Sequence, residues 1–192
     1  MAFNHNDHYH RLLLRQVPPE AQRGLDVGCG TGLFARRLAA RGLDVDAVDP
    51  SEEVIAAAPA IDGVRFVQAD ITAMPLPKGR YDFISCLASL HHMPFGTVSG
   101  LREALAPGGV LAVLGCYRGS SWSDHLVSAA AVPVNAAARL ALSGRPAASP
   151  VQAPVATASM TLDEVRSQAA DLLPGAGIRR LLFWRYLLVH RN

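Results

Sequence analysis

Short apolar runs alternate with amphipathic segments along the first 116 residues of the chain. The apolar runs are rich in β-favouring residues and predict strands at residues 23–27, 44–49, 64–70, 81–87 and 110–115. Segments between them have apolar positions at helical spacing, and these are residues 33–40, 51–58 and 97–105. Strands that alternate with helices predict right-handed βαβ units and a parallel sheet covered on both faces.

The N-terminal part and the region before the last helix are less regular. Residues 5–16 predict a helix that packs its leucines inward and ends before Pro18-Pro19. Residues 123–143 have the composition of a helix, kinked at Pro133. Residues 144–158 are rich in Ala, Pro and Ser, which favours an irregular segment.

Turn and cap signals mark the C-terminal elements. Thr161-Leu162-Asp163-Glu164 has the form of a capping box, which starts a helix that Pro174-Gly175 ends. Residues 178–182 and 184–190 then predict two closing strands, with a tight turn near Trp184-Arg185.

Size and composition limit the classes of protein that fit. A chain of 192 residues, half of them hydrophobic, suits one domain with a substantial core. A net charge of +2 without a long basic run argues against nucleic acid as a partner. Cys29, Cys86 and Cys116 lack CxxC spacing, so we expect neither a disulfide framework nor a metal site. Without an apolar signal core or membrane span, we expect a cytoplasmic protein with no membrane partner, as a monomer or homodimer.

A glycine turn follows the first strand, at Gly28-Cys29-Gly30-Thr31-Gly32. Glycine lacks a Cβ, so the chain can turn sharply there and a ligand can lie against the backbone at the start of the next helix. A dinucleotide fingerprint would need its third glycine at Leu33. Asp26 precedes the turn, and a carboxylate suits a ligand that carries an ammonium and a sulfonium.

Acidic residues follow the next two strands. Asp49 lies 21 positions beyond Gly28 at a strand tip, where one carboxylate can accept hydrogen bonds from two ribose hydroxyls. Asp70 ends the third strand and can accept from an adenine amino group while the Ile71 amide serves a ring nitrogen. Asp82 stands at the opposite end of its strand, so we interpret it as structural.

The ordered succession of these motifs resembles the class I S-adenosylmethionine-dependent methyltransferases that act on small molecules. The resemblance spans residues 24–116 and rests on the segments 25–32, 47–51, 68–71, 81–84 and 105–111. It implies an α/β, Rossmann-like fold: a seven-stranded, mostly parallel sheet with helices on both faces and an antiparallel last strand. It also implies S-adenosylmethionine as cofactor and S-adenosylhomocysteine as product.

The resemblance assigns roles where the motifs match. Gly28 and Gly30 would abut the methionine portion and ribose, and Asp26 would orient the ammonium directly or through water. The backbone at Cys86 or Leu87 would also meet that ammonium. The implied cofactor-binding residues are Asp26, Gly28, Cys29, Gly30, Asp49, Pro50, Asp70, Ile71, Cys86 and Leu87.

We expect one domain with four parts. They are an N-terminal helical cap (1–19), a cofactor-binding core (20–117), a substrate-cover insertion (118–160) and a final helix with closing strands (161–192).

His91 and His92 follow the fourth strand and are the candidate catalytic residues. Either one could act as a base or orient the acceptor, and the alternative is a structural cap on the following segment. Trp122 fits packing or a pocket wall. Candidate acceptor-pocket residues are His8, Tyr9, His10, Tyr117 and His125.

The predicted activity is methyl transfer to an oxygen, nitrogen or carbon atom of a small molecule. A protein that binds S-adenosylmethionine without transferring methyl, as a sensor, a partner subunit or a catalyst of another sulfonium-assisted reaction, is the alternative. An NAD-dependent oxidoreductase is disfavoured by Leu33 and by the lack of a Tyr-x-x-x-Lys pair, since Lys78 is the only lysine.

Overall fold

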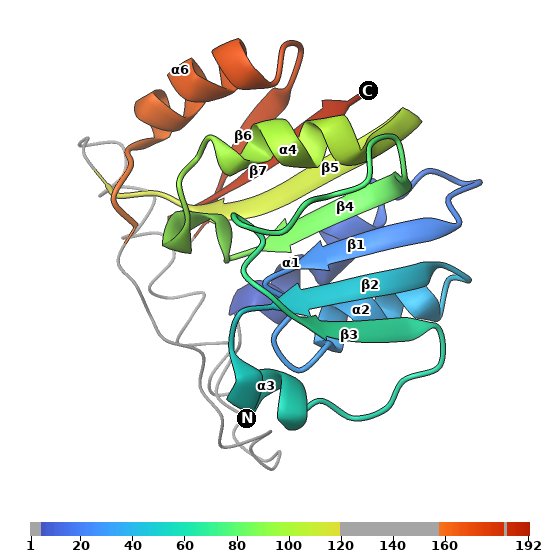
Figure 1. The fold of residues 1–192 in the computed structure, drawn as a ribbon. Helices are drawn as coiled ribbons and strands as arrows, with labels where there is room; N and C mark the ends of the chain where they lie inside the picture. Colours follow the sequence, from blue (N-terminus) through green and yellow to red (C-terminus); the bar gives the residue numbers. More distant parts are fainter. Residues whose placement is uncertain (1–4, 120–157, 183) are drawn as a thin grey trace.

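The structure is a computed structural model, and it describes residues 5–119, 158–182 and 184–192 (Figure 1). The helix expected at residues 123–143 and the irregular segment up to residue 157 lie outside the described residues, as do Trp122 and His125. Within the described part of the chain, no helix is long and apolar enough to cross a membrane.

A seven-stranded sheet organises the chain, in the order β3-β2-β1-β4-β5-β7-β6 (Figure 1). The strands are β1 (Arg23–Val27), β2 (Asp44–Asp49), β3 (Val64–Gln68), β4 (Tyr81–Leu87), β5 (Leu105–Cys116), β6 (Gly177–Leu181) and β7 (Arg185–Arg191). The first five strands pair in parallel, and β7 is antiparallel to both of its neighbours. The predicted mostly parallel sheet with an antiparallel last strand is confirmed.

Helices cover both faces of the sheet, as predicted (Figure 1). They are α1 (His5–Leu14), α2 (Leu33–Ala39), α3 (Glu52–Ala56), α4 (Thr97–Ala104) and α6 (Leu162–Leu172), with a 3-10 turn η1 (Leu90–His92). Helices α4 and α6 lie in front of the sheet in Figure 1, and α1 and α2 lie behind it. Each face has its own apolar cluster, which we call the front cluster and the rear cluster.

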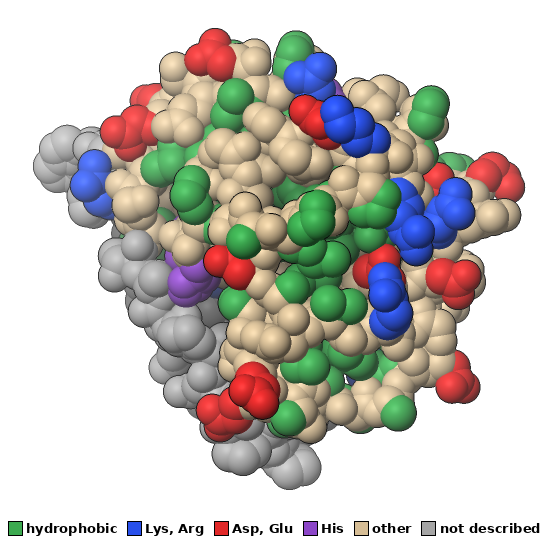
Figure 2. All heavy atoms as spheres, viewed as in Figure 1, with side chains coloured by type: hydrophobic (Ala, Val, Ile, Leu, Met, Phe, Trp, Pro, Cys, Tyr) green, Lys and Arg blue, Asp and Glu red, His purple; other side chains and the backbone are tan. Residues whose placement is uncertain are grey.

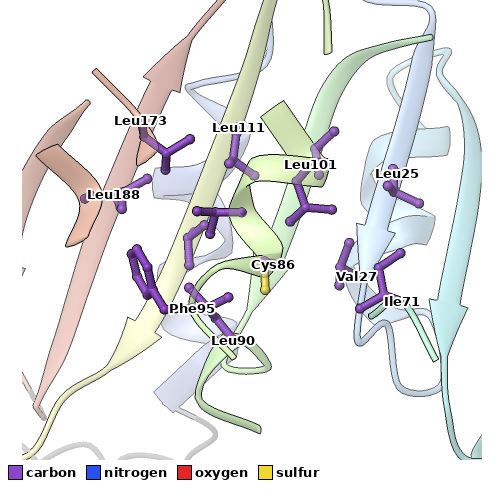
Figure 3. Packing of buried hydrophobic residues seen from close by; sticks show 14 of the residues in the cluster. Leu25, Val27, Ile71, Cys86, Leu90, Phe95, Leu101, Leu111, Leu173 and Leu188 are labelled. Atoms are coloured by element: carbon purple, nitrogen blue, oxygen red, sulfur yellow. The ribbon is translucent and has the colours of Figure 1, made fainter. Parts of the chain in front are cut away.

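The front cluster joins β1, β4 and β5 to α4 and α6 (Figure 3). Leu25, Leu101 and Leu111 are fully buried there, and Ile71 from the loop after β3 packs in the same cluster. The rear cluster includes Phe34 and Leu38 of α2. Burial on both faces holds the sheet rigid, because the packed side chains leave little room for the strands to shift.

Local signals predicted most element starts and fewer element ends. Ser51 caps α3 as predicted, since its Oγ accepts a hydrogen bond from the Val54 amide at 3.3 Å. That helix ends at Ala56 instead of residue 58, and α1 ends at Leu14 instead of residue 16. The capping box of α6 is confirmed, because Thr161 and Glu164 exchange both hydrogen bonds.

Residues 107–109, which separate the expected helix at 97–105 from the expected strand at 110–115, lie inside β5. Tyr81 pairs with Leu105 and Phe83 with Val110, so the intervening residues bulge out of the ladder. Gly108 has a φ of 75° in this bulge, a value that glycine adopts without steric cost. The strand therefore begins five residues earlier than its apolar run.

Asp82 has the structural role that its position indicates. Its Oδ2 accepts hydrogen bonds from the backbone amides of Gln22 and Arg23, both at 2.9 Å. These bonds tie the start of β1 to the start of β4. Lysine and arginine side chains gather over this amino end of the strands (Figure 2).

Candidate functional site

The carboxyl ends of β1 to β4 meet at one edge of the sheet, on the left in Figure 1. Val27 at the end of β1 pairs with Val48 in β2 and with Cys86 in β4. Asp49 pairs with Gln68, the last residue of β3. The glycine turn, the acids and the two histidines predicted from the sequence therefore all follow strands that end at this edge, which is where open parallel sheets bind ligands.

The glycine turn has three glycines in the left-handed region: Gly28, Gly30 and Gly32 have φ values of 68°, 56° and 81°. Each has different surroundings. A Cβ on Gly32 would lie 2.4 Å from the Phe66 ring, and one on Gly28 would lie 2.3 Å from the Cβ of Ser89. A Cβ on Gly30 would meet no atom within 4 Å. Gly30 is therefore the glycine of the turn that borders open space.

Asp49 ties the glycine turn to the end of β2. Its Oδ2 accepts a hydrogen bond from the Gly30 amide at 3.0 Å, and its Oδ1 accepts one from the Ser51 amide at 3.0 Å. These bonds orient the half-buried carboxylate. Each oxygen of a carboxylate can accept more than one hydrogen bond, so the group keeps capacity for a ligand with two adjacent hydroxyls.

Asp26 lies beneath the turn. Its side chain is 2% exposed, and its Oδ1 accepts a hydrogen bond from Ser85 Oγ at 2.8 Å. Burial raises the pKa of the Asp26 carboxyl to about 7, against the opposing effects of Ser85 and the Ala35 amide. Its direct or water-mediated contact with a ligand ammonium stays a prediction.

Asp70 is exposed at the end of β3, where a short turn fixes its carboxylate. Its Oδ1 accepts hydrogen bonds from the amide and the hydroxyl of Thr72, at 2.9 and 2.8 Å. These bonds hold the pKa of Asp70 below its usual value, so the group is ionised at neutral pH. Gln68 Nε2 donates to the Pro50 carbonyl at 3.2 Å, which links this side of the site to the residue after Asp49.

The two cysteines near the site are thiols at neutral pH. Burial raises the pKa of Cys86 to about 12 and also raises that of Cys29. A thiolate is the nucleophilic form of cysteine, so covalent chemistry at these sulfurs is disfavoured. Leu87 is half-buried at the end of β4.

His91 and His92 lie side by side in η1. Their ring centroids are 4.1 Å apart with an interplanar angle of 39°. His91 is half-buried and His92 is exposed, and histidine atoms reach the surface at this edge of the sheet (Figure 2). Among the residues that the structure describes, no cluster of His, Cys, Asp or Glu is arranged to hold a metal ion.

Two of the predicted acceptor-pocket residues, Tyr9 and Tyr117, pack in different clusters. Tyr9 is buried in the rear cluster, and its hydroxyl donates to the Leu182 carbonyl at 3.2 Å. Tyr117 is buried in the front cluster, and its amide donates to the Trp184 carbonyl at 3.0 Å.

The structure describes the side chain of only one of the two candidate histidines of α1, His10. His10 packs edge-on against Phe34, with ring centroids 5.0 Å apart, and burial lowers its pKa to about 4. The side chain of His8 lies outside the part of the chain that the structure describes.

Sequence reasoning missed two serines of β4 and the loop after it. Ser85 bonds to Asp26, and Ser89 Oγ donates to the Val27 carbonyl at 2.7 Å. No spacing signals these contacts, because the partners are 59 and 62 positions apart in the chain. Only the pairing of β1 with β4 brings them together.

Comparison with known proteins places these features in a family. Residues 25–109 match a family described as a methyltransferase domain. The chain is 38% identical over 198 residues to an uncharacterised methyltransferase of Mycobacterium bovis, with 98% of this chain and 96% of the relative covered.

Solved structures share the fold. An S-adenosylmethionine-dependent methyltransferase of Mesorhizobium loti superposes with a TM-score of 0.65 at 18% identity, covering 97% of this chain and all of that one. The [4+2]-cyclase SpnF is 27% identical, with a TM-score of 0.54, and covers 62% of this chain and 49% of its own.

Proposed function

Because the chain belongs to the class I S-adenosylmethionine-dependent methyltransferases, we propose that it methylates a small-molecule acceptor. The observation that carries the proposal is the joined pair of Asp49 and Gly30. A carboxylate at the tip of β2 is held by the amide of the one turn glycine that borders open space. This pair offers acceptors for a ribose diol and room for the atoms attached to it.

The residues around this pair fit the donor. Asp49 would hold the ribose hydroxyls, and Asp70 with the Ile71 amide would bind the adenine. The backbone at Cys86 or Leu87 would bind the methionine ammonium. The negative charges of Asp49 and the ionised form of Asp26 favour a cationic ligand over an anionic one.

When bound, S-adenosylmethionine supplies a methyl group that its sulfonium already activates. The protein therefore has to align the acceptor with that group and keep water out, and no elaborate catalytic constellation is needed. A base is required only where the acceptor atom loses a proton during attack.

We propose that the His92 side chain takes this proton and that His91 orients the His92 ring. His92 is the more exposed of the two, and their rings are in contact. His92→Ala should lower the turnover number about 10²-fold or more while S-adenosylhomocysteine affinity stays the same. His91→Ala is the matched variant on the same turn. If both variants lose stability and keep turnover, the histidines are a structural cap.

We also propose that the methyl group goes to an oxygen, nitrogen or carbon atom of the acceptor, and that the protein is cytoplasmic and monomeric or homodimeric. The activity is tested by incubating the protein with labelled S-adenosylmethionine and a panel of phenols, amines and carboxylates. We expect label transfer to at least one class.

Two other outcomes would count against methyl transfer. Donor binding without turnover across the panel would favour the alternative of a binding protein or another sulfonium-assisted reaction. One of the structural relatives, a [4+2]-cyclase, is named for a reaction other than methyl transfer. Absence of S-adenosylhomocysteine binding in calorimetry would contradict both functions.

A further inference from the structure

We propose that Ser89 is a positioning residue that couples the proposed S-adenosylmethionine site at the glycine turn to the turn η1, which carries His91 and His92. It holds the glycine turn with its side chain and the histidine turn with its backbone. The functional part of this proposal rests on the proposed donor binding, whereas the contacts that carry it do not.

Ser89 satisfies the last carbonyl of β1. Its side chain is buried, and its Oγ donates to the Val27 carbonyl at 2.7 Å. Val27 ends β1 directly before the glycine turn. Losing this donor would leave a buried carbonyl without that partner, which is costly in an apolar environment. The hydroxyl therefore fixes the point from which the turn departs.

Ser89 also explains why position 28 holds a glycine. A Cβ on Gly28 would lie 2.3 Å from the Cβ of Ser89 and 2.7 Å from its Oγ. The φ of 68° disfavours other residues as well. Gly30 differs, because a Cβ there would meet no protein atom within 4 Å. We infer that Gly28 is required for packing against Ser89 and Gly30 for access by the donor.

The backbone of Ser89 begins the turn that carries the histidines. Its carbonyl accepts a hydrogen bond from the His92 amide at 3.0 Å. The preceding residue, Ala88, has a φ of 52°, which is uncommon for a residue with a Cβ, and its amide donates to the Leu114 carbonyl at 2.7 Å. The contact of Ser89 Oγ with Cys86 Sγ, at 3.0 Å, adds an anchor to β4. A displacement of Ser89 therefore moves the glycine turn and His92 together.

The first test removes the hydroxyl with Ser89→Ala. Calorimetry with S-adenosylhomocysteine, well below the thermal midpoint, should show a dissociation constant raised about 5- to 50-fold while the protein stays folded. Ser99→Ala, on α4, is the matched control and should bind as the wild type does. An affinity within twofold of the wild type in folded Ser89→Ala would overturn the positioning role.

The second test separates the two glycines by rescue. Gly28→Ala should lower the thermal midpoint and weaken S-adenosylhomocysteine binding, and adding Ser89→Gly should restore part of both, because it removes the atoms that the new methyl group meets. Gly30→Ala, which also places a Cβ at a positive φ, should lower the midpoint less than Gly28→Ala does, lose binding and gain nothing from Ser89→Gly. If Ser89→Gly restores neither property to Gly28→Ala, the proposed contact is wrong.

These measurements distinguish the two proposals. A wild-type protein that fails to bind S-adenosylhomocysteine overturns the proposed function and the positioning role for the donor. The midpoints of the Gly28 variants, measured without ligand, still decide whether Ser89 packs against Gly28.

Discussion

Asp26 is a carboxyl group placed where its charged form is disfavoured. Its folded pKa of about 7 lies above the ordinary value, so the folded state binds the proton more tightly than the unfolded state does. The stability that this group contributes is present below about pH 4, because the proton is then bound in both states. It is lost as pH rises from there to about 7.

We predict that Asp26→Asn removes this pH dependence. The amide oxygen can still accept the bond from Ser85 but carries no charge. The difference in free energy of unfolding between the variant and the wild type should grow in favour of the variant by about 3 kcal/mol from pH 5 to pH 8. Urea unfolding at each pH measures this difference.

Comparison with the wild type isolates Asp26 from other titrating groups. Burial lowers the pKa of His10 and His190. The stability that these histidines contribute therefore increases as pH rises, whereas that of Asp26 decreases. Both proteins share that contribution. A constant difference in stability across the pH range would contradict the raised pKa of Asp26.

The second residue-scale prediction concerns the ribose contact. Asp49→Asn keeps one acceptor oxygen and replaces the other with a donor, so it cannot accept from both the Gly30 and Ser51 amides. We expect S-adenosylhomocysteine binding to weaken by about 2 to 3 kcal/mol, the scale of a hydrogen bond to a charged group. Calorimetry measures this loss, and Asp62→Asn, an exposed acid, serves as the control. Unchanged affinity in Asp49→Asn would exclude the ribose role.

At the residue scale, the sequence predicted where the site residues lie in the chain better than it predicted their hydrogen-bond partners. Asp49 was found from its distance to Gly28, because a strand and a helix take a regular number of residues. The bonds to two amides depend on loop geometry that spacing does not describe. Ser85 and Ser89 were missed for the same reason. Tyr9 and Tyr117 are buried in different clusters, and their place in an acceptor pocket stays a prediction.

At the scale of single elements, we predict that the capping box of α6 stabilises the protein. Thr161 accepts from the Glu164 amide, and Glu164 accepts from the Thr161 amide at 2.7 Å. Thr161→Ala should lower the free energy of unfolding by about 1 kcal/mol, because one of the first helical amides loses its acceptor. Urea unfolding measures the change, and Ser159→Ala, exposed and outside the helix, is the control. A loss no larger than that of the control would mean that the cap does not stabilise α6.

Elements with such signals were predicted well, and their ends less well. A cap or a proline specifies where a helix can start or stop, but α1 and α3 each end two residues before the predicted position. The bulge in β5 likewise follows from pairing with β4, which no local pattern encodes.

At the scale of the whole molecule, Gly115 holds the closing strands against the parallel core. A Cβ at this position would lie 2.0 Å from Cζ of Tyr186 in the neighbouring strand β7. Gly115→Ala should therefore lower the free energy of unfolding by about 1 to 3 kcal/mol through overpacking. Thermal unfolding tests this against Gly177→Ala, where a Cβ meets no atom within 4 Å. Equal midpoints for the two variants would show that Tyr186 moves aside without cost.

The order of the strands is also a property of the whole molecule. Alternating strands and helices predict a parallel sheet, but they do not say that β1 lies between β2 and β4. The resemblance to a family supplied the seven strands and the antiparallel end, and the pairing of the strands confirmed both.

The sequence by itself determined the strands, most helix starts, the glycine turn and the acids at the strand tips. These features depend on residues close together in the chain, whose spacing limits what the backbone can do. Tertiary structure alone decided that Ser89 packs on Gly28, that Ser85 holds Asp26 and that Tyr186 fills the space beside Gly115. Such contacts join residues far apart in the chain, and they exist only once strand order and register bring the two backbones together.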